Sequence, residues 1–356
     1  MKNTTRLESL RRGQNTLLRH WKTALATALC AVACFHPGLA QVAPPSILRI
    51  DVANNVLYDE DASDVSKFAT DPNVATDSHS ARNFNRAVGI ADIVAVNGQP
   101  VTGTHIRSAV NVLLRTAPTP GQAISDTVRT GLAIFTFEIL KSDGTPIGTI
   151  VTNGFAGGSA PPGAPSTATA GSNFVITGGT GAFLGGRGQM EMAANPPGVA
   201  AQRGTSITED PANRRLNGGG TQRYIVHLIP MSAPQILTTP AGPAVTHSSD
   251  FSLVTSSKPA AAGEVLSLFA TGLGPTVPAV DPGQPFPSSP LAVVNSPVEV
   301  KVNGSSAEVL GAVGYPGSLD GYQVNFRVPQ DAAKGVATIQ VSAAWIAGPA
   351  VQIALQ

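Results

Sequence analysis

Hydrophobic and polar residues alternate in short runs along the first two thirds of the chain. A period of two residues is typical of a β-strand with one buried and one exposed face. In Gly131–Leu140, for example, Phe135, Phe137 and Ile139 share one face, whereas Glu138 lies on the other. The pattern predicts strands at Ile47–Val52, Gly89–Val96, Val101–Arg115, Gly131–Leu140, Pro146–Thr152, Asn173–Thr177, Gln189–Ala193 and Gln222–Ile229.

Turn and loop residues separate these runs. Asn97-Gly98 is a strong signal for a tight hairpin turn, and Ser142–Thr145 is a second turn. Three longer stretches are rich in small or polar residues and predict surface loops: Asp59–His79, Ser159–Ala170 and Asn195–Gly220. No segment between Gln41 and Ile229 has a sustained helical period. The count of about eight strands predicts an all-β, antiparallel barrel or sandwich over this region.

The remainder of the chain follows a boundary at Pro230–Pro234 and differs in strand length and proline content. Its strands are shorter, and a proline-rich segment, Thr276–Pro290, must be irregular. Strands are predicted at Gly263–Gly274, Val298–Val302, Ala307–Ala312, Tyr322–Val328, Val336–Ser342 and Val351–Leu355. This pattern favours an immunoglobulin-like β-sandwich without the cysteine pair of antibody domains. The predicted domains are therefore a barrel over 41–232 and a sandwich over 233–356.

Residues 1–40 have the layout of an export signal. Six Lys and Arg residues precede an apolar run, Thr23–Phe35, that is too short to span a bilayer. Gly38 and Ala40 offer small residues for cleavage after Ala40. Both cysteines, Cys30 and Cys34, lie in this segment, so the mature chain would have none. Lipidation at Cys34 is an alternative to cleavage at Ala40. The expected location is outside the cytoplasm: secreted, periplasmic or at the cell surface.

Charge limits the choice of partners. The hydrophobic fraction is 42% and the charged fraction 13%. Without residues 1–40 the chain has 17 basic and 21 acidic residues, a net charge of −4. Because it also lacks a basic cluster, nucleic acid and anionic membrane surfaces are poor candidate partners.

The stretch Ser172–Met192 contains most of the closely spaced glycines of the first domain and has two interpretations. Val175–Gly185 resembles the phosphate-binding turn of a nucleotide-sugar epimerase. That site needs a helix after the turn, but Gly185, Gly186 and Gly188 would weaken a helix severely. The sequence therefore favours a β-hairpin: a strand, a glycine-rich corner that carries Phe183, and a return strand.

This hairpin resembles the glycine-rich signature of dirigent proteins and allene oxide cyclase-like barrels. The resemblance covers roughly Ile47–Ile229, and its specific part is Phe174–Gly188. It implies a closed antiparallel barrel, often trimeric, with an interior cavity for a small apolar molecule. The residues that carry this structural motif are Gly178, Gly179, Gly181, Phe183, Gly185, Arg187 and Gly188.

The C-terminal part resembles a Solibacter-type uncharacterised domain of secreted bacterial proteins. The matching runs are Ala270–Pro275, Val298–Gly304 and Gly321–Pro329, followed by Gly335. The resemblance implies secretion and an accessory β-sandwich. A cell-surface or extracellular protein is the candidate partner of this domain. No reaction is implied by it.

Few residues suggest chemistry. No histidine stands at metal-ligand spacing, no Gly-x-Ser-x-Gly elbow occurs, and we expect no metal or cofactor. No catalytic residue is assigned. If the barrel has a functional cavity, the residues to consider are His105, Glu138, Asp126, Arg129 and Arg187. For each of them a structural or surface role is the alternative interpretation.

The sequence thus predicts an exported two-domain β-protein that binds a small apolar ligand or interacts outside the cell. One alternative is a cyclase-like or dirigent-like enzyme acting on a lipid or phenolic substrate. The other is a structural or adhesive exoprotein. A homo-oligomer is consistent with all three hypotheses.

Overall fold

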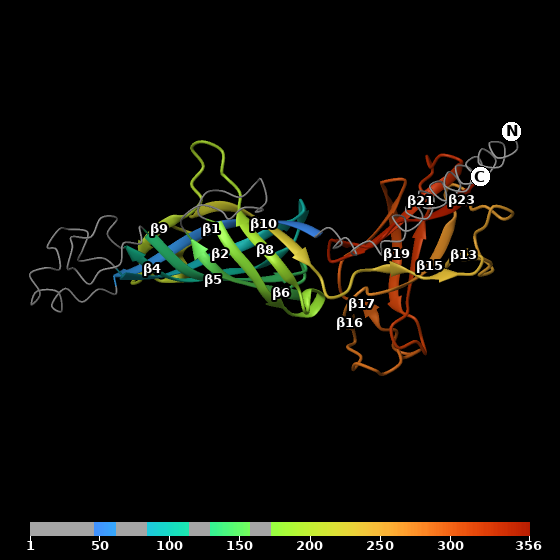
Figure 1. Cartoon of the computed structure of the whole chain (residues 1–356), viewed down its shortest axis with the longest axis horizontal. Helices are drawn as coiled ribbons and strands as arrows, with labels where there is room; N and C mark the ends of the chain where they lie inside the picture. The colour runs from blue at the N-terminus through green and yellow to red at the C-terminus, as the bar shows by residue number, and fades with distance from the viewer. Residues whose placement is uncertain (1–45, 62–83, 114–128, 157–171) are drawn as a thin grey trace, which may run out of the picture. The chain divides into compact units, whose positions relative to one another are not determined.

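The computed structural model describes residues 46–61, 84–113, 129–156 and 172–356. Within these ranges the chain is all-β: it contains no α-helix and two short 3₁₀ turns, η2 (Gly181–Phe183) and η3 (Pro211–Asn213). Residues 1–40, for which the sequence predicts an export signal, and Asp126 lie outside the described residues. The strands form two large sheets that share no strand, as Figure 1 shows.

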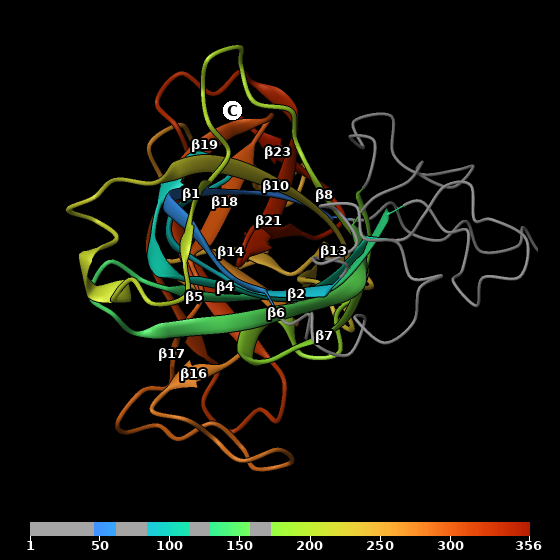
Figure 2. The same ribbon diagram turned by 90° about the vertical axis from the view of Figure 1, so that its left-hand side faces the viewer.

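The first sheet closes into an antiparallel barrel of eight strands, in the order β2-β4-β5-β6-β7-β8-β10-β1. Closure comes from β1, which pairs with β10 along one edge and with β2 along the other. The eight strands of the barrel are β1 (Ser46–Asp61), β2 (Phe84–Val96), β4 (Thr102–Leu113), β5 (Arg129–Leu140), β6 (Pro146–Ala156), β7 (Ser172–Gly179), β8 (Arg187–Met192) and β10 (Gly220–Ile229). Figure 2 shows these strands around a ring.

All eight predicted strands of this region are present, and most are longer than the alternation indicated. β1 continues to Asp61, so the first residues of the predicted loop at 59–79 are strand. A register shift between Val52 and Asn55 explains the difference. Such a bulge changes which residues face inward and ends the simple alternation of apolar and polar residues.

Two tight turns match their sequence signals. Asn97 and Gly98 both have positive φ, 50° and 79°, and connect β2 to the two-residue strand β3 (Gln99–Pro100). Positive φ at both central residues is the requirement of a type I′ hairpin turn. The Asn97 Oδ1 atom accepts a hydrogen bond from the backbone N–H of Arg49 at 2.8 Å, which fastens this turn to β1.

The segment predicted as a loop at 195–220 contains two elements, which corrects that expectation. β9 (Arg203–Ser206) pairs in parallel with β1, and η3 follows it. The sequence Arg-Gly-Thr-Ser has no apolar alternation, because β9 is held by polar contacts rather than by a buried face. The Arg203 guanidinium binds the Glu209 carboxylate at 2.7 and 3.0 Å.

Apolar side chains make up most of the buried interior of the barrel. Its largest fully buried members come from all sides of the ring and include Leu48, Ile50, Phe135, Phe137, Ile139, Ile150 and Phe174. Phe183, from η2, belongs to the same core and is 1% exposed. The barrel is therefore closed at that end by a side chain from the glycine-rich corner.

The second sheet has eleven strands and its own hydrophobic core. Its longer members are β15 (Val265–Thr271), β18 (Val298–Val302), β19 (Ser305–Gly314), β20 (Tyr322–Arg327), β21 (Gly335–Ala343) and β23 (Val351–Leu355). Its shorter members are β11 (Gln235–Ile236), β14 (Val245–His247), β16 (Thr276–Val277), β17 (Val293–Val294) and β22 (Ile346–Ala347). A separate two-stranded sheet, β12 (Thr238–Thr239) and β13 (Gly242–Pro243), stands between β11 and β14 in the sequence.

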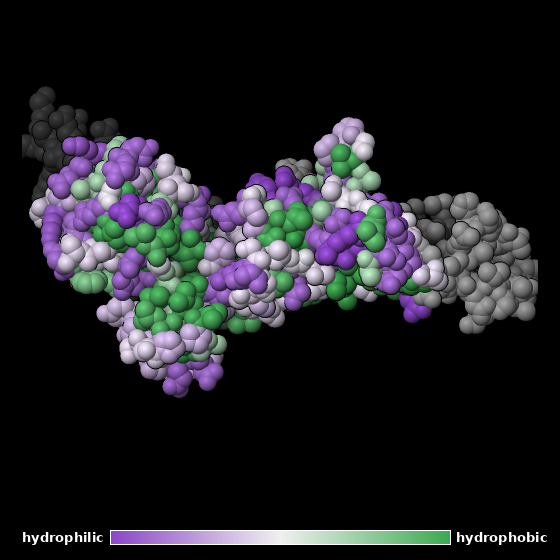
Figure 3. Space-filling view, turned by 180° about the vertical axis from the view of Figure 1, so that it is seen from behind, coloured by the Kyte–Doolittle hydropathy of each residue, from purple (hydrophilic) through white to green (hydrophobic). Residues whose placement is uncertain are grey.

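The longer strands of this sheet agree with those predicted, and Asn303-Gly304 forms the expected turn between β18 and β19. The two-residue strands were not predicted, because a period of two cannot be recognised in two residues. Hydrophobic residues also reach the surface of this part of the chain, as Figure 3 shows. Val277 and Val293, on the paired strands β16 and β17, are 53% and 50% exposed.

Candidate functional site

The candidate site is a group of polar side chains inside the barrel. In an antiparallel ladder, residues directly opposite one another share a face of the sheet. His105 on β4 lies opposite Phe137 on β5, and Arg107 lies opposite Phe135. Because both phenylalanines are fully buried, His105 and Arg107 point into the barrel as well.

His105 lies among aromatic rings and is 1% exposed. Its imidazole stacks on the Phe137 ring at 4.5 Å between centroids and on the Phe135 ring at 5.5 Å. Its Nδ1 atom lies 3.2 Å from the carbonyl oxygen of Thr136, and its Nε2 atom lies 3.1 Å from the hydroxyl of Tyr224 on β10. A carbonyl only accepts, so Nδ1 carries the proton and the Tyr224 hydroxyl donates to Nε2.

Burial fixes the protonation of both groups. Loss of solvent lowers the pKa of His105 to about 3, with a further lowering by the nearby Arg107 charge; the hydrogen bond to Thr136 acts in the opposite direction. Burial also raises the pKa of the Tyr224 hydroxyl well above its usual range. At neutral pH the imidazole is therefore uncharged and the phenol protonated. The pair is a fixed hydrogen bond inside an apolar core.

The next row of inward residues contains Arg107 and Thr152. Gly89, Arg107, Phe135, Thr152 and Ile176 lie opposite one another across five strands. The Arg107 guanidinium lies over the Phe135 ring, 5.5 Å from its centroid. The Thr152 side chain is fully buried, and its hydroxyl has no hydrogen-bond partner among the residues that the structure describes. A buried hydroxyl without a partner costs free energy unless something else satisfies it.

Small side chains follow in the third row. Ala87, Ala109 and Ala133 lie opposite one another on β2, β4 and β5, and all three are buried. The size of the inward-facing side chains thus changes along the barrel axis. The end near η2 is packed with large apolar side chains, whereas the inward positions of β2, β4 and β5 toward the opposite end are occupied by alanines beside Arg107.

Of the residues selected from the sequence, only His105 lies in this group. Glu138 is exposed on the outer face of β5, opposite the phenylalanine face, as its place in the alternation indicates. Arg187 is exposed at the start of β8. Arg129 is the first residue of β5, and Asp126 precedes it outside the described residues. The described residues therefore do not bring these candidates together.

Sequence reasoning missed Arg107, Thr152 and Tyr224. Each stands at an alternate position of a predicted strand, so each had an equal chance of facing inward or outward. The signal that could have found Arg107 is its spacing of two residues from His105. Thr152 and Tyr224 required the register of the closed barrel, which connects strands far apart in the sequence.

The glycine-rich corner forms a β-hairpin, because β7 and β8 pair antiparallel on either side of η2. Gly188 has φ +133°, and a Cβ atom there would collide with the carbonyl oxygen of His227. Gly181 has φ +60° at the start of η2. Gly185 also has positive φ, and a Cβ at Gly179 would lie 2.5 Å from a carbonyl oxygen; a Cβ at Gly178 would meet nothing within 4 Å.

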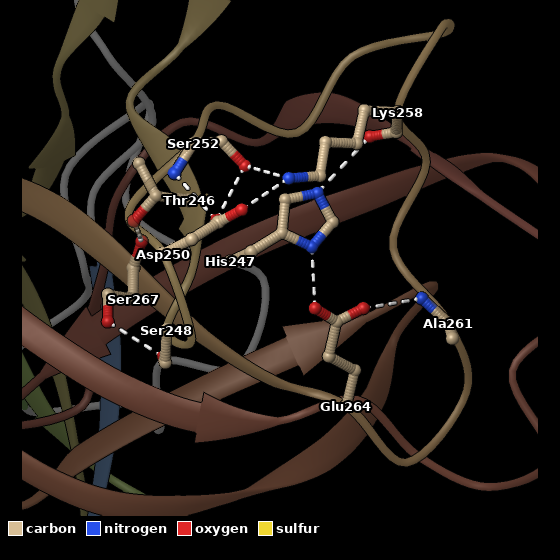
Figure 4. Close-up of polar contacts among 9 residues, drawn as sticks. All are labelled: Thr246, His247, Ser248, Asp250, Ser252, Lys258, Ala261, Glu264 and Ser267. Atoms are coloured by element: carbon tan, nitrogen blue, oxygen red, sulfur yellow. Dashed lines mark hydrogen bonds and ion pairs between the residues drawn. The ribbon is translucent and has the colours of Figure 1, made fainter.

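A second polar cluster lies in the C-terminal sheet (Figure 4). The His247 Nδ1 atom lies 2.5 Å from Glu264 Oε1, and its Nε2 atom faces the Lys258 carbonyl oxygen at 3.3 Å. The Lys258 ammonium binds Asp250 at 2.5 Å and the Ser252 hydroxyl at 2.6 Å. Both ring nitrogens of His247 thus face acceptors, and the Ser252 hydroxyl is held by Lys258 and Asp250. This arrangement ties a loop to the sheet and lacks the serine–imidazole contact of a hydrolytic triad.

An open groove of about 480 Å³ lies on the outside of the barrel. Asp51 and Arg223 line it and form a two-pronged ion pair with one another at 2.6 and 2.9 Å. Because these two charges satisfy each other and the other described residues of the groove are uncharged, the groove offers less for recognition than the interior.

In the described part of the chain, no three His, Cys, Asp or Glu side chains gather in a way that could hold a metal ion. No helix within the described ranges combines the length and hydrophobicity that a membrane crossing requires.

Comparison with known proteins adds no relative. No protein-family model, no curated protein and no solved structure matches this chain.

Proposed function

We propose that the protein is an exported binding protein whose barrel holds a small, largely apolar molecule. The observation that supports this proposal best is Thr152: its hydroxyl is fully buried inside the barrel and has no partner in the described part of the chain. It lies in the same row as Arg107, with Phe135 between them. A ligand with one polar atom near Thr152 would satisfy the hydroxyl, and the aromatic and alanine side chains around it would contact the apolar remainder.

The state of His105 and Tyr224 supports binding over acid–base catalysis. A base with a pKa of about 3 accepts a proton poorly at neutral pH, and the hydroxyl of Tyr224 already donates to it. In the proposal, His105, Tyr224 and the phenylalanine rings around them form one rigid wall of the binding site. The cyclase-like alternative would need a titrating group closer to neutral pH.

Our proposal extends to family and location. The closed barrel, together with the glycine corner and the Phe183 plug, supports membership of the dirigent and allene oxide cyclase-like barrels. We propose an immunoglobulin-like sandwich for the nearly closed C-terminal sheet, which would serve as the contact with an extracellular partner. Export would follow from residues 1–40, with cleavage after Ala40.

Native mass spectrometry of the protein released by an expressing cell tests the binding proposal. We expect a bound molecule of low mass that leaves on gentle activation. Thr152→Val keeps the shape of the side chain but removes the hydroxyl, and should weaken binding about tenfold, the effect of one lost hydrogen bond to a buried polar group, which lowers the bound fraction. Thr136→Val makes the same change on the outer face of β5 and should leave the bound fraction unchanged. A wild-type protein without any bound molecule would overturn the proposal, as would equal occupancy in the Thr152→Val variant.

A further inference from the structure

A cavity of about 380 Å³ lies where two motifs of the sequence meet, and we name it the corner cavity. Gly181, Ala182 and Leu184 of the glycine-rich corner form one wall. The turn after β15, Gly272–Pro275, forms another. Both walls belong to one compact unit of the chain, Pro45–Gln356. None of these residues is part of the proposed interior site, so the corner cavity is a separate feature.

Two hydrogen bonds hold the walls of the corner cavity in place. The Tyr322 hydroxyl donates to the carbonyl oxygen of Gly274 at 2.8 Å, which fixes the turn after β15 to β20. The Asn295 Nδ2 atom donates to the carbonyl oxygen of Pro146 at 2.6 Å, which ties the segment before β18 to the start of β6. The groups around the cavity are therefore set before a ligand binds, as in most small-molecule sites.

Ser296 gives the corner cavity a polar group that is not satisfied. It lines the cavity, it is 5% exposed, and its hydroxyl has no hydrogen-bond partner among the described residues. A buried hydroxyl without a partner costs free energy. Because a serine hydroxyl both donates and accepts, a ligand with a hydroxyl or carbonyl group beside Ser296 would recover that cost.

The remaining lining restricts the ligand further. Leu184 and Met231 line the corner cavity and are 62% and 74% exposed, so large apolar side chains lie at its opening. Methionine adapts its shape to what it contacts. Among the described lining residues only Asp320 is charged, and it is exposed. A negative charge without a nearby positive one disfavours an anionic ligand.

We propose that the corner cavity is a second binding site, which takes an uncharged small molecule with an apolar body and one hydroxyl or carbonyl group. Ser296 makes the hydrogen bond, and Leu184 and Met231 contact the apolar body. The volume of about 380 Å³ falls within the range of small-molecule pockets.

A fluorescence titration of the purified full-length chain with Prodan, an uncharged aromatic ketone, tests the proposal. Its emission should move to shorter wavelength and saturate, because the probe leaves water for an apolar site. Ser296→Ala removes the hydroxyl and should weaken the affinity about tenfold, the effect of one lost hydrogen bond. Ala182→Trp places a large ring in the cavity and should abolish the shift.

Ser305→Ala is the matched control, since it removes a hydroxyl from an exposed position of β19, and it should leave the affinity unchanged. Thr152→Val changes only the interior site and should also leave it unchanged. Met231→Trp fills the opening of the cavity instead and serves if Ala182→Trp fails to fold by circular dichroism.

An emission that never saturates in the wild type would overturn the proposal. So would an affinity that Ser296→Ala leaves unchanged, or that a folded cavity-filling variant leaves unchanged. A loss of affinity in Thr152→Val alone would place the probe inside the barrel, which overturns this second site but leaves the proposed function standing.

Discussion

The two faces of β4 and β5 differ in a way that hydrophobicity alone does not explain. Both are largely apolar, but only one is buried. The inner face combines Phe135 and Phe137 with His105, a polar residue that the core accommodates through two hydrogen bonds. The outer face has Ile106 and Ile134 in contact with solvent. The inner face packs into the core of the barrel, whereas apolar side chains of the outer face remain exposed in the described part of the chain.

The largest expected difference between the two faces concerns packing. Phe137→Ala removes a fully buried ring and should lower the free energy of unfolding by about 3–5 kcal/mol. Ile134→Ala changes an exposed side chain on the same strand and should lower it by less than about 1 kcal/mol. Urea denaturation at low micromolar concentration, followed by far-UV circular dichroism, measures both. Similar losses for the two variants would contradict the assignment of inner and outer faces.

A smaller effect should appear as a dependence on pH. His105 has a pKa of about 3 in the folded protein and about 6.5 when unfolded, so the unfolded state binds more protons between these values. Folding stability should therefore fall as the pH decreases below 6.5, by about 2 kcal/mol at pH 5 from this residue. His105→Phe should flatten this part of the pH profile.

Tyr224→Phe is the control for that measurement, because it removes the hydroxyl that donates to His105 but keeps the buried imidazole. Its stability should decrease with falling pH as steeply as that of the wild type. A wild-type profile that is flat between pH 6.5 and pH 5 is the outcome that would refute a neutral, buried His105.

The smallest effect concerns the unpartnered hydroxyl. In protein freed of ligand, Thr152→Val should raise the free energy of unfolding by about 1 kcal/mol, because it removes a buried polar group that no described residue satisfies. Thr136→Val, on the outer face, should change it by no more than about 0.5 kcal/mol. A loss of stability on Thr152→Val would show that the folded protein already satisfies the hydroxyl.

The sequence predicted the architecture of the barrel better than its interior. Period-two alternation located every barrel strand, and Asn97-Gly98 located a turn, because both signals are local. It also placed Glu138 opposite the phenylalanines. β9 was missed since its pairing with β1 leaves no apolar pattern.

The interior site depended on long-range register instead. His105 and Tyr224 are 119 residues apart, and their contact exists only because β1 closes the ring between β2 and β10. Thr152 stands two residues after Ile150 on the inward side of β6, and its place between Phe135 and Ile176 comes from the pairing of β6 with β5 and β7. No local period records which strands pair, so the residues that matter most inside the barrel could not be selected from sequence.

The most direct test of the binding proposal is a crystal structure of the protein purified, without refolding, from cells that export it. The proposal predicts electron density for a molecule larger than water, inside the barrel and within hydrogen-bonding distance of the Thr152 Oγ1 atom. An interior that shows only protein atoms, or a single water on Thr152, would contradict it.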